Sequence, residues 1–141
     1  FGVLGRTLVH VGGAGAGQVA KACNQMVMVA AIQASAEALR LAAAAGVDVA
    51  KVREALMGGP AASRVLELFG GRMVARDFNA GVEARLHHKD FGLVAEEAHR
   101  HGIALPVASV VAQQLNALMA QGWGSDDTAS LLRVLERAGP R

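Results

Sequence analysis

The feature that most constrains the fold is a run of apolar residues that recur every three or four positions from Gly17 to Ala45. Neither proline nor glycine interrupts this run before Gly46, a residue type that commonly ends a helix. The spacing predicts one helix of about 28 residues, about 42 Å long at 1.5 Å per residue. This is about twice the usual helix length, so the rest of the chain has to pack around it.

The remaining segments predict shorter helices separated by turn residues. They are expected after Asp48, after Ser63, and over residues 87–101, 106–121 and 128–138. Alanine and leucine dominate the composition and aromatic residues make up 4%, which favours helices over sheets. We therefore expect an all-α domain, with one residual strand at residues 7–11 and an interruption at Gly70–Gly71.

Composition also limits the partners and the compartment. The net charge is 14 − 12 = +2 without a basic block, so nucleic acid is not expected as a partner. The single cysteine, Cys23, fits a reducing compartment, and we expect the cytoplasm. Polar residues from Gln33 onward follow the apolar run closely, so we expect neither a membrane span nor a signal peptide.

A glycine cluster precedes the long helix in the stretch HVGGAGAGQVAKACNQ, residues 10–25. Gly15, Gly17 and Ala20 fit G-x-G-x-x-A, the pattern of a dinucleotide-binding loop. That loop belongs to a strand–helix–strand unit of about 30 residues, with an acidic residue after the second strand. Here the helix is too long and no second strand follows, so the glycines do not indicate this fingerprint.

Lys21 and Asn24 lie on one stripe of the long helix together with Gly17, because the three are four and three residues apart. Gly17 leaves space for another molecule to approach the backbone. A lysine there can protonate the oxygen of a carbonyl or stabilise its developing charge. A lysine near a helix start is more often a solvent-facing residue, and the spacing by itself leaves both interpretations open.

The complete pattern Gly12-x-x-Gly15-x-Gly17-x-x-x-Lys21-x-x-Asn24 resembles the hallmark of the β-hydroxyacid dehydrogenase family. The segments AEALRLAAAAGVD, LHHKDFGLV and GWGSDDTASLL resemble further family motifs, so the resemblance covers almost the whole chain. It implies the helical C-terminal domain of an NAD- or NADP-dependent oxidoreductase, similar to that of 6-phosphogluconate dehydrogenase. Residues 1–12 would then end a dinucleotide-binding domain and linker, and residues 13–141 would form the helical domain.

The resemblance also implies roles for individual residues. Lys21 matches the catalytic lysine, Asn24 and Gly17 match positions at the substrate, and Lys89 matches a lysine that reaches the cofactor. Asp90 is expected to cap its helix, and no metal site is expected. LHHKD and GGPAASRVLE resemble family members that act on tartronate semialdehyde more than those that act on 3-hydroxyisobutyrate. The implied substrate is thus a small hydroxyacid or semialdehyde.

Other polar residues are given structural roles. His87 and His88 are adjacent and are expected to be solvated or to cap a helix, and Asp126 and Asp127 are expected to cap the last helix.

A purely helical interaction module is the alternative function from a class other than enzymes. A helix of this length leaves apolar surface for another domain or a second subunit to cover, and the family resemblance implies a homodimer or a higher homo-oligomer.

Overall fold

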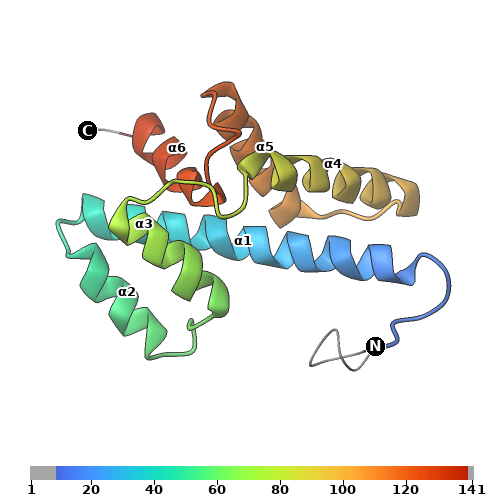
Figure 1. The fold of residues 1–141 in the computed structure, drawn as a ribbon, viewed down its shortest axis with the longest axis horizontal. Helices are drawn as coiled ribbons and strands as arrows, with labels where there is room; N and C mark the ends of the chain where they lie inside the picture. The colour runs from blue at the N-terminus through green and yellow to red at the C-terminus, as the bar shows by residue number, and fades with distance from the viewer. Residues whose placement is uncertain (1–8, 140–141) are drawn as a thin grey trace.

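The computed structural model describes residues 9–139, and within them the secondary structure is entirely helical apart from one isolated bridge between Glu83 and Asp127 (Figure 1). The elements are α1 (Ala16–Ala44), α2 (Val49–Met57), the π-turn η1 (Leu66–Gly70), α3 (Gly71–Ala75), α4 (Ala84–His101), α5 (Pro106–Ala120), the 3₁₀ turn η2 (Thr128–Ser130) and α6 (Leu131–Ala138). The all-α prediction is confirmed. Residues 9–11 of the expected strand are exposed coil, and residues 7–8 lie outside the described residues.

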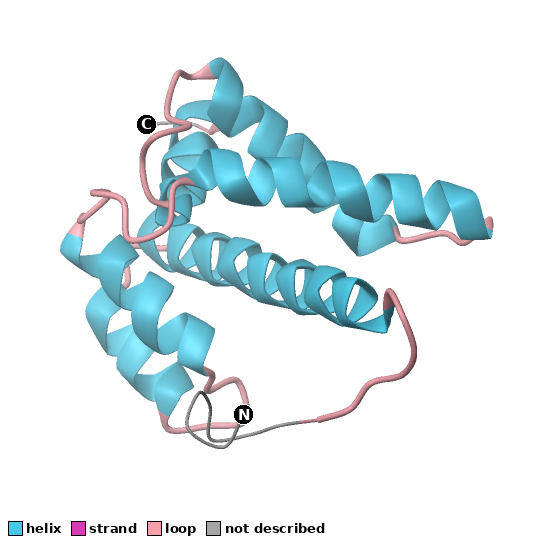
Figure 2. Ribbon diagram, turned by 45° about the vertical axis from the view of Figure 1, so that its right-hand side comes forward, coloured by secondary structure: helices cyan, strands magenta, loops and turns pink. Residues whose placement is uncertain are grey.

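The long helix α1 is the axis of the fold. In both ribbon views α2 and α3 lie on one side of α1, and α4 and α5 lie on the other (Figures 1 and 2). The C-terminal half of α1 packs against α6, and its side chains Ile32 and Leu39 enter one core with Leu115, Leu118 and Leu131. The predicted helix and its end are therefore confirmed, with Gly46 at φ +71° just beyond Ala44.

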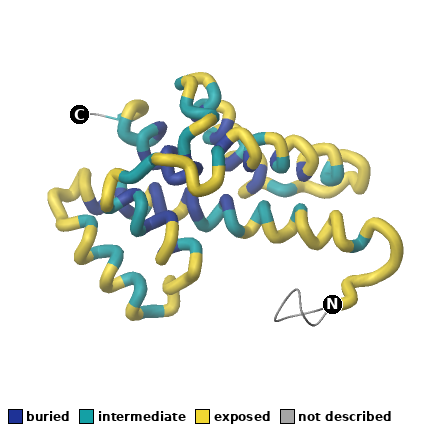
Figure 3. Tube along the Cα trace, in the orientation of Figure 1, coloured by how far each residue is buried: buried dark blue, intermediate teal, exposed yellow. Residues whose placement is uncertain are grey.

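The N-terminal half of α1 is poorly covered (Figure 3). Val29 is the first buried residue of the helix, whereas the side chains of Val19 and Val27 remain 48% and 66% exposed. The part of the chain that the structure describes thus leaves apolar surface of this helix open, as expected from its length.

By length and composition alone, α1 also meets the criteria for a membrane-crossing helix, and the expectation that the chain has no membrane span stays a prediction. Helices in the core of globular proteins meet the same two criteria. The C-terminal half of α1 is such a core helix, because Ile32 and Ala36 are fully buried among the other helices.

The sequence predicts an interruption at Gly70–Gly71. In the structure the helix continues through both glycines and changes its type there. Both glycines keep right-handed helical angles, and a π-turn over Leu66–Gly70 runs directly into α3. The Arg53 side chain donates to the carbonyl oxygens of Leu66 and Glu67 at 3.3 and 2.7 Å, which satisfies acceptors in the irregular turn. A Cβ at position 70 would lie 2.9 Å from Leu66 Cδ1, so glycine allows this close packing.

The capping predictions are largely confirmed. The Asp48 carboxylate accepts from the amides of Ala50 and Lys51, and the Ser63 hydroxyl accepts from the amide of Leu66. Pro106 occupies the first turn of α5. Asp127 caps η2, which leads into α6, whereas Asp126 accepts a hydrogen bond from Arg133 at 2.7 Å.

Candidate functional site

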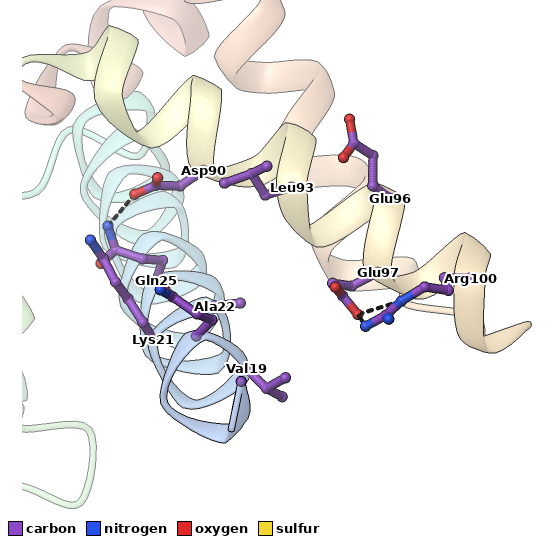
Figure 4. Close-up of a pocket in the computed structure, with 11 residues that line it drawn as sticks. Val19, Lys21, Ala22, Gln25, Asp90, Leu93, Glu96, Glu97 and Arg100 are labelled. Carbon is purple, nitrogen blue, oxygen red and sulfur yellow. Dashed lines mark hydrogen bonds and ion pairs between the residues drawn. The ribbon is translucent and has the colours of Figure 1, made fainter. Parts of the chain in front are cut away.

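A cavity of about 420 Å³ separates the first turns of α1 from the C-terminal half of α4 (Figure 4). Both helices contribute polar side chains and aliphatic surface to it. The lining residues are Gly15, Gln18, Val19, Lys21, Ala22, Gln25, Asp90, Leu93, Glu96, Glu97 and Arg100. Its size and mixed lining suit a small polar ligand.

Lys21 enters the cavity from the second turn of α1. Its side chain is exposed, and among the described residues its ammonium group has neither a hydrogen-bond nor an ion-pair partner. The helix begins after Gly15, which adopts φ +88° and supplies no side-chain cap. A Cβ built at Gly17 would have no neighbour within 4 Å, so open space surrounds this turn. An unpaired lysine next to open space is free to bind an oxygen of a ligand.

Asn24 does not line this cavity, although the sequence places it near Lys21. Its amide donates to the Gln25 side-chain oxygen at 3.4 Å. Gln25 takes the inward position instead and donates from Nε2 to Asp90 Oδ2 at 2.5 Å. The spacing of four residues places Gln25 on the same face of the helix as Lys21, but it does not predict the partner Asp90 on another helix.

Asp90 does not cap a helix, so that expectation is wrong. Helix α4 already begins at Ala84, where the amides of Ala84 and Arg85 donate to Asp126 and Gly124 carbonyl oxygens. Asp90 is therefore a mid-helix residue, and its carboxylate accepts from Gln25 across the cavity. The neighbouring Lys89 is exposed and lies outside the cavity lining, with no hydrogen-bond or ion-pair partner among residues 9–139.

Charged side chains of α4 form the other end of the cavity. Arg100 Nη2 donates to Glu97 Oε2 at 2.5 Å, and His101 Nε2 lies 3.4 Å from the same oxygen. The hydrogen bond from Arg100 lowers the pKa of Glu97, so this residue is a carboxylate at neutral pH. Sequence reasoning assigned no role to Glu97 or Arg100. Within the described residues, no group of three His, Cys, Asp or Glu side chains is arranged to hold a metal ion.

His87 is a core residue, which corrects the expectation of a solvated or capping histidine. Its side chain is 1% exposed, and its Nδ1 lies 2.7 Å from the Thr128 hydroxyl oxygen. Burial lowers the pKa of His87, against the opposing fields of Asp90 and Asp127. His88 is half-buried and its Nε2 pairs with the Asn116 side-chain oxygen at 2.7 Å.

We expect the free energy of unfolding to fall as the pH is lowered below about 6.5, the ordinary pKa of histidine. The pKa of His87 is lower in the folded state, so between the two pKa values the unfolded chain binds more protons. Urea midpoints of the full-length protein at about pH 7.5 and about pH 5.5 measure this loss. Replacing His87 with glutamine should reduce the difference between the two urea midpoints, whereas the same replacement of the exposed His99 should leave this difference unchanged. An equal difference in both variants would contradict the prediction.

Comparisons of the sequence with known proteins identify the family of this chain. Residues 15–135 match the family described as NAD-binding of NADP-dependent 3-hydroxyisobutyrate dehydrogenase. The chain is 40% identical over 136 residues to 2-hydroxy-3-oxopropionate reductase of Escherichia coli K12, covering 96% of this chain and 47% of that protein. It is 36% identical over 137 residues to the protein named probable 3-hydroxyisobutyrate dehydrogenase-like 1, mitochondrial, of Arabidopsis thaliana. This match covers 97% of this chain and 41% of the Arabidopsis protein.

Solved structures show the same arrangement. A crystal structure of 3-hydroxyisobutyrate dehydrogenase from Salmonella typhimurium matches with a TM-score of 0.83 at 28% identity, covering 85% of this chain and 42% of that chain. The fold and these matches define a helical domain that these longer proteins also contain. The chain belongs to the β-hydroxyacid dehydrogenase family. It spans less than half the length of the curated relatives described above.

Proposed function

We propose that this chain is the helical, substrate-facing domain of an NAD- or NADP-dependent β-hydroxyacid dehydrogenase. The observation that carries the proposal is Lys21, which lines the cavity between α1 and α4 and whose ammonium group has no hydrogen-bond or ion-pair partner among the described residues. In this proposal residues 13–141 form the domain, and residues 1–12 are the end of a dinucleotide-binding domain and its linker.

Lys21 is the proposed general acid and base. In reduction it donates a proton to the carbonyl oxygen of the substrate, and in oxidation it takes the proton from the hydroxyl group. Its positive charge also stabilises the negative charge that develops on this oxygen. When bound, the nicotinamide cofactor supplies or accepts the hydride. Gly17, with open space beside its backbone, and Asn24, on the adjoining exposed surface of α1, do not line the cavity and are proposed to contact the part of the substrate that extends beyond it.

The proposed cofactor ligand within the described residues is Lys89. A lysine ammonium binds phosphate as a point charge, and that of Lys89 is exposed and unpaired among the described residues. One exposed lysine can thus bind a phosphate group at one edge of a dinucleotide. The described residues contain no sheet with a nucleotide-binding loop, so we assign most of the cofactor surface to the dinucleotide-binding domain of the whole enzyme.

We propose tartronate semialdehyde (2-hydroxy-3-oxopropionate) as the substrate and D-glycerate as the product. The 40% identity to the Escherichia coli 2-hydroxy-3-oxopropionate reductase supports this choice, as do the segments LHHKD and GGPAASRVLE. The alternative is 3-hydroxyisobutyrate or a related short β-hydroxyacid, which the Arabidopsis and Salmonella relatives support by their names.

Steady-state turnover by the full-length protein distinguishes these substrates. We expect kcat/KM for tartronate semialdehyde, measured with NADH and NADPH, to exceed that for the semialdehyde of 3-hydroxyisobutyrate by at least about tenfold. The first substrate carries a hydroxyl group where the second carries a methyl group, and a site that hydrogen-bonds this hydroxyl discriminates against its loss. The opposite preference would replace the proposed substrate by the alternative, and no turnover of either semialdehyde or of a related short β-hydroxyacid would reject the dehydrogenase proposal.

Replacing Lys89 with alanine should raise KM for the nicotinamide cofactor by about tenfold and change kcat less, because the lost contact is made in the ground state as well as in the transition state. Steady-state kinetics with the cofactor varied at saturating aldehyde give both constants. The exposed Lys51 on α2 provides a matched control, as Lys51→Ala removes the same charge far from the cavity. An effect confined to KM for the aldehyde would show that Lys89 serves the substrate instead.

A non-catalytic helical dimerisation module is the second candidate. The exposed side chains of Val19 and Val27 favour it, because apolar surface on one helix is suited to a second subunit. A dehydrogenase that also assembles through this surface combines both roles, and we propose a cytoplasmic homodimer or higher homo-oligomer. Neither nucleic acid nor a membrane is part of the proposal.

A further inference from the structure

One hydrogen bond joins the beginning of α1 to α4. Gln25 Nε2 donates to Asp90 Oδ2, across 65 positions in the sequence. Among the described residues, it is the only side-chain hydrogen bond that connects residues 16–28 with another element. Figure 4 shows Lys21 and Gln25 on the same side of α1, with the Gln25 amide turned toward Asp90.

The first turns of α1 have little packing to hold them. Val29 is the first fully buried residue of the helix, and before it only the partly buried Ala22, Met26 and Met28 pack against the core. A segment with few buried contacts opens more easily than the rest of a fold. A hydrogen bond to a carboxylate contributes more than a neutral one, and this one is partly shielded from water. This bond therefore adds a directional contact that helps to fix the position of Lys21 relative to α4.

The location of Asp90 is consistent with a residue that holds α1 against α4. It lies in the middle of α4, away from the helix ends where a carboxylate would cap free amides. Its partner Gln25 is one turn from Lys21, and its sequence neighbour is Lys89. The bond thus connects the two helices that carry the two lysines of the proposed mechanism.

We propose that Gln25 and Asp90 form a positioning pair that holds Lys21 in place over the cavity. The pair touches neither of the reacting atoms and acts through the placement of α1 against α4. This inference rests on the proposed dehydrogenase function for its catalytic consequence. A misplaced general acid lowers kcat, because reacting groups have to meet within a narrow range of distance and angle.

The test uses the full-length protein with Gln25→Glu, Asp90→Asn and the double variant. Gln25→Glu places two carboxylates opposite each other and should lower kcat about tenfold, with KM for the cofactor within about twofold of wild type. The double variant restores an amide opposite a carboxylate with the roles exchanged, and should recover kcat to within about threefold of wild type. Gln113→Glu, an identical change on the exposed surface of α5, is the matched control.

Hydrogen exchange supplies a readout that does not require turnover. In Gln25→Glu, amides of residues 16–24 should exchange faster than in wild type, while those of α5 stay unchanged. Unchanged exchange in residues 16–24, or a double variant that stays as slow as Gln25→Glu, would overturn the positioning pair. If the wild-type protein turns over neither semialdehyde, the dehydrogenase proposal and the catalytic consequence fail, whereas exchange still decides whether the pair holds α1.

Discussion

Replacing Lys21 with alanine in the full-length protein is expected to lower kcat by at least about 10²-fold, the usual scale for removal of a general acid. The fold should survive, because the Lys21 side chain is exposed and makes no hydrogen bond or ion pair among the described residues. The activity should fall because the ammonium group is placed to meet a ligand, and the fold should persist because the helix does not depend on this group.

The measurement is kcat for reduction of tartronate semialdehyde, together with the melting temperature of the variant. Lys51→Ala removes the same charge from the exposed surface of α2 and should retain wild-type kcat. A Lys21→Ala protein that keeps most of its activity would contradict the assignment of Lys21 as the general acid.

The 141 residues expressed by themselves are expected to be folded, helical and without measurable turnover. Hydride transfer requires a cofactor held against the substrate, and the described residues lack the sheet that binds a dinucleotide in this class of enzyme. The exposed apolar side chains of Val19 and Val27 should drive self-association into a two-fold dimer.

Two measurements check this expectation: sedimentation at micromolar concentration, and turnover of tartronate semialdehyde with NADH or NADPH. Circular dichroism serves as the control, since it establishes that the chain is helical before either result is interpreted. A strict monomer would contradict the association, and measurable turnover would show that these 141 residues suffice for catalysis.

Much of the fold follows from local rules. The apolar spacing of α1 and the glycine at position 46 predict a helix that the structure places at Ala16–Ala44. Asp48, Ser63 and Pro106 mark helix starts because each satisfies or removes free amides at the first turn. These signals act over three or four residues, so tertiary packing does not have to be known.

The start of α4 is harder to predict from the sequence. The roles expected for His87 and Asp90 are wrong for this reason. The helix begins three residues before His87, at Ala84, where its first amides bond to the 124–126 loop. This register turns His87 into the core and puts Asp90 in the middle of the helix. The partners that fix it lie about 40 residues later in the chain, so the local pattern did not contain them.

The candidate site was predicted in part. Lys21 does enter a cavity, and its role was suggested by spacing and by the family resemblance. Gln25 was missed because its partner Asp90 is on another helix, and only the packing of α1 against α4 brings them together. Asn24 was placed at the substrate by resemblance, and its role there stays a prediction.

The most direct test is a crystal structure of the full-length protein with D-glycerate and the oxidised cofactor. The proposed mechanism predicts that the hydroxyacid lies in the cavity between α1 and α4, with Lys21 Nζ about 2.6–3.2 Å from the hydroxyl oxygen that reacts. A hydroxyacid bound in that cavity with its reacting hydroxyl on another side chain, or bound away from α1 altogether, would contradict it.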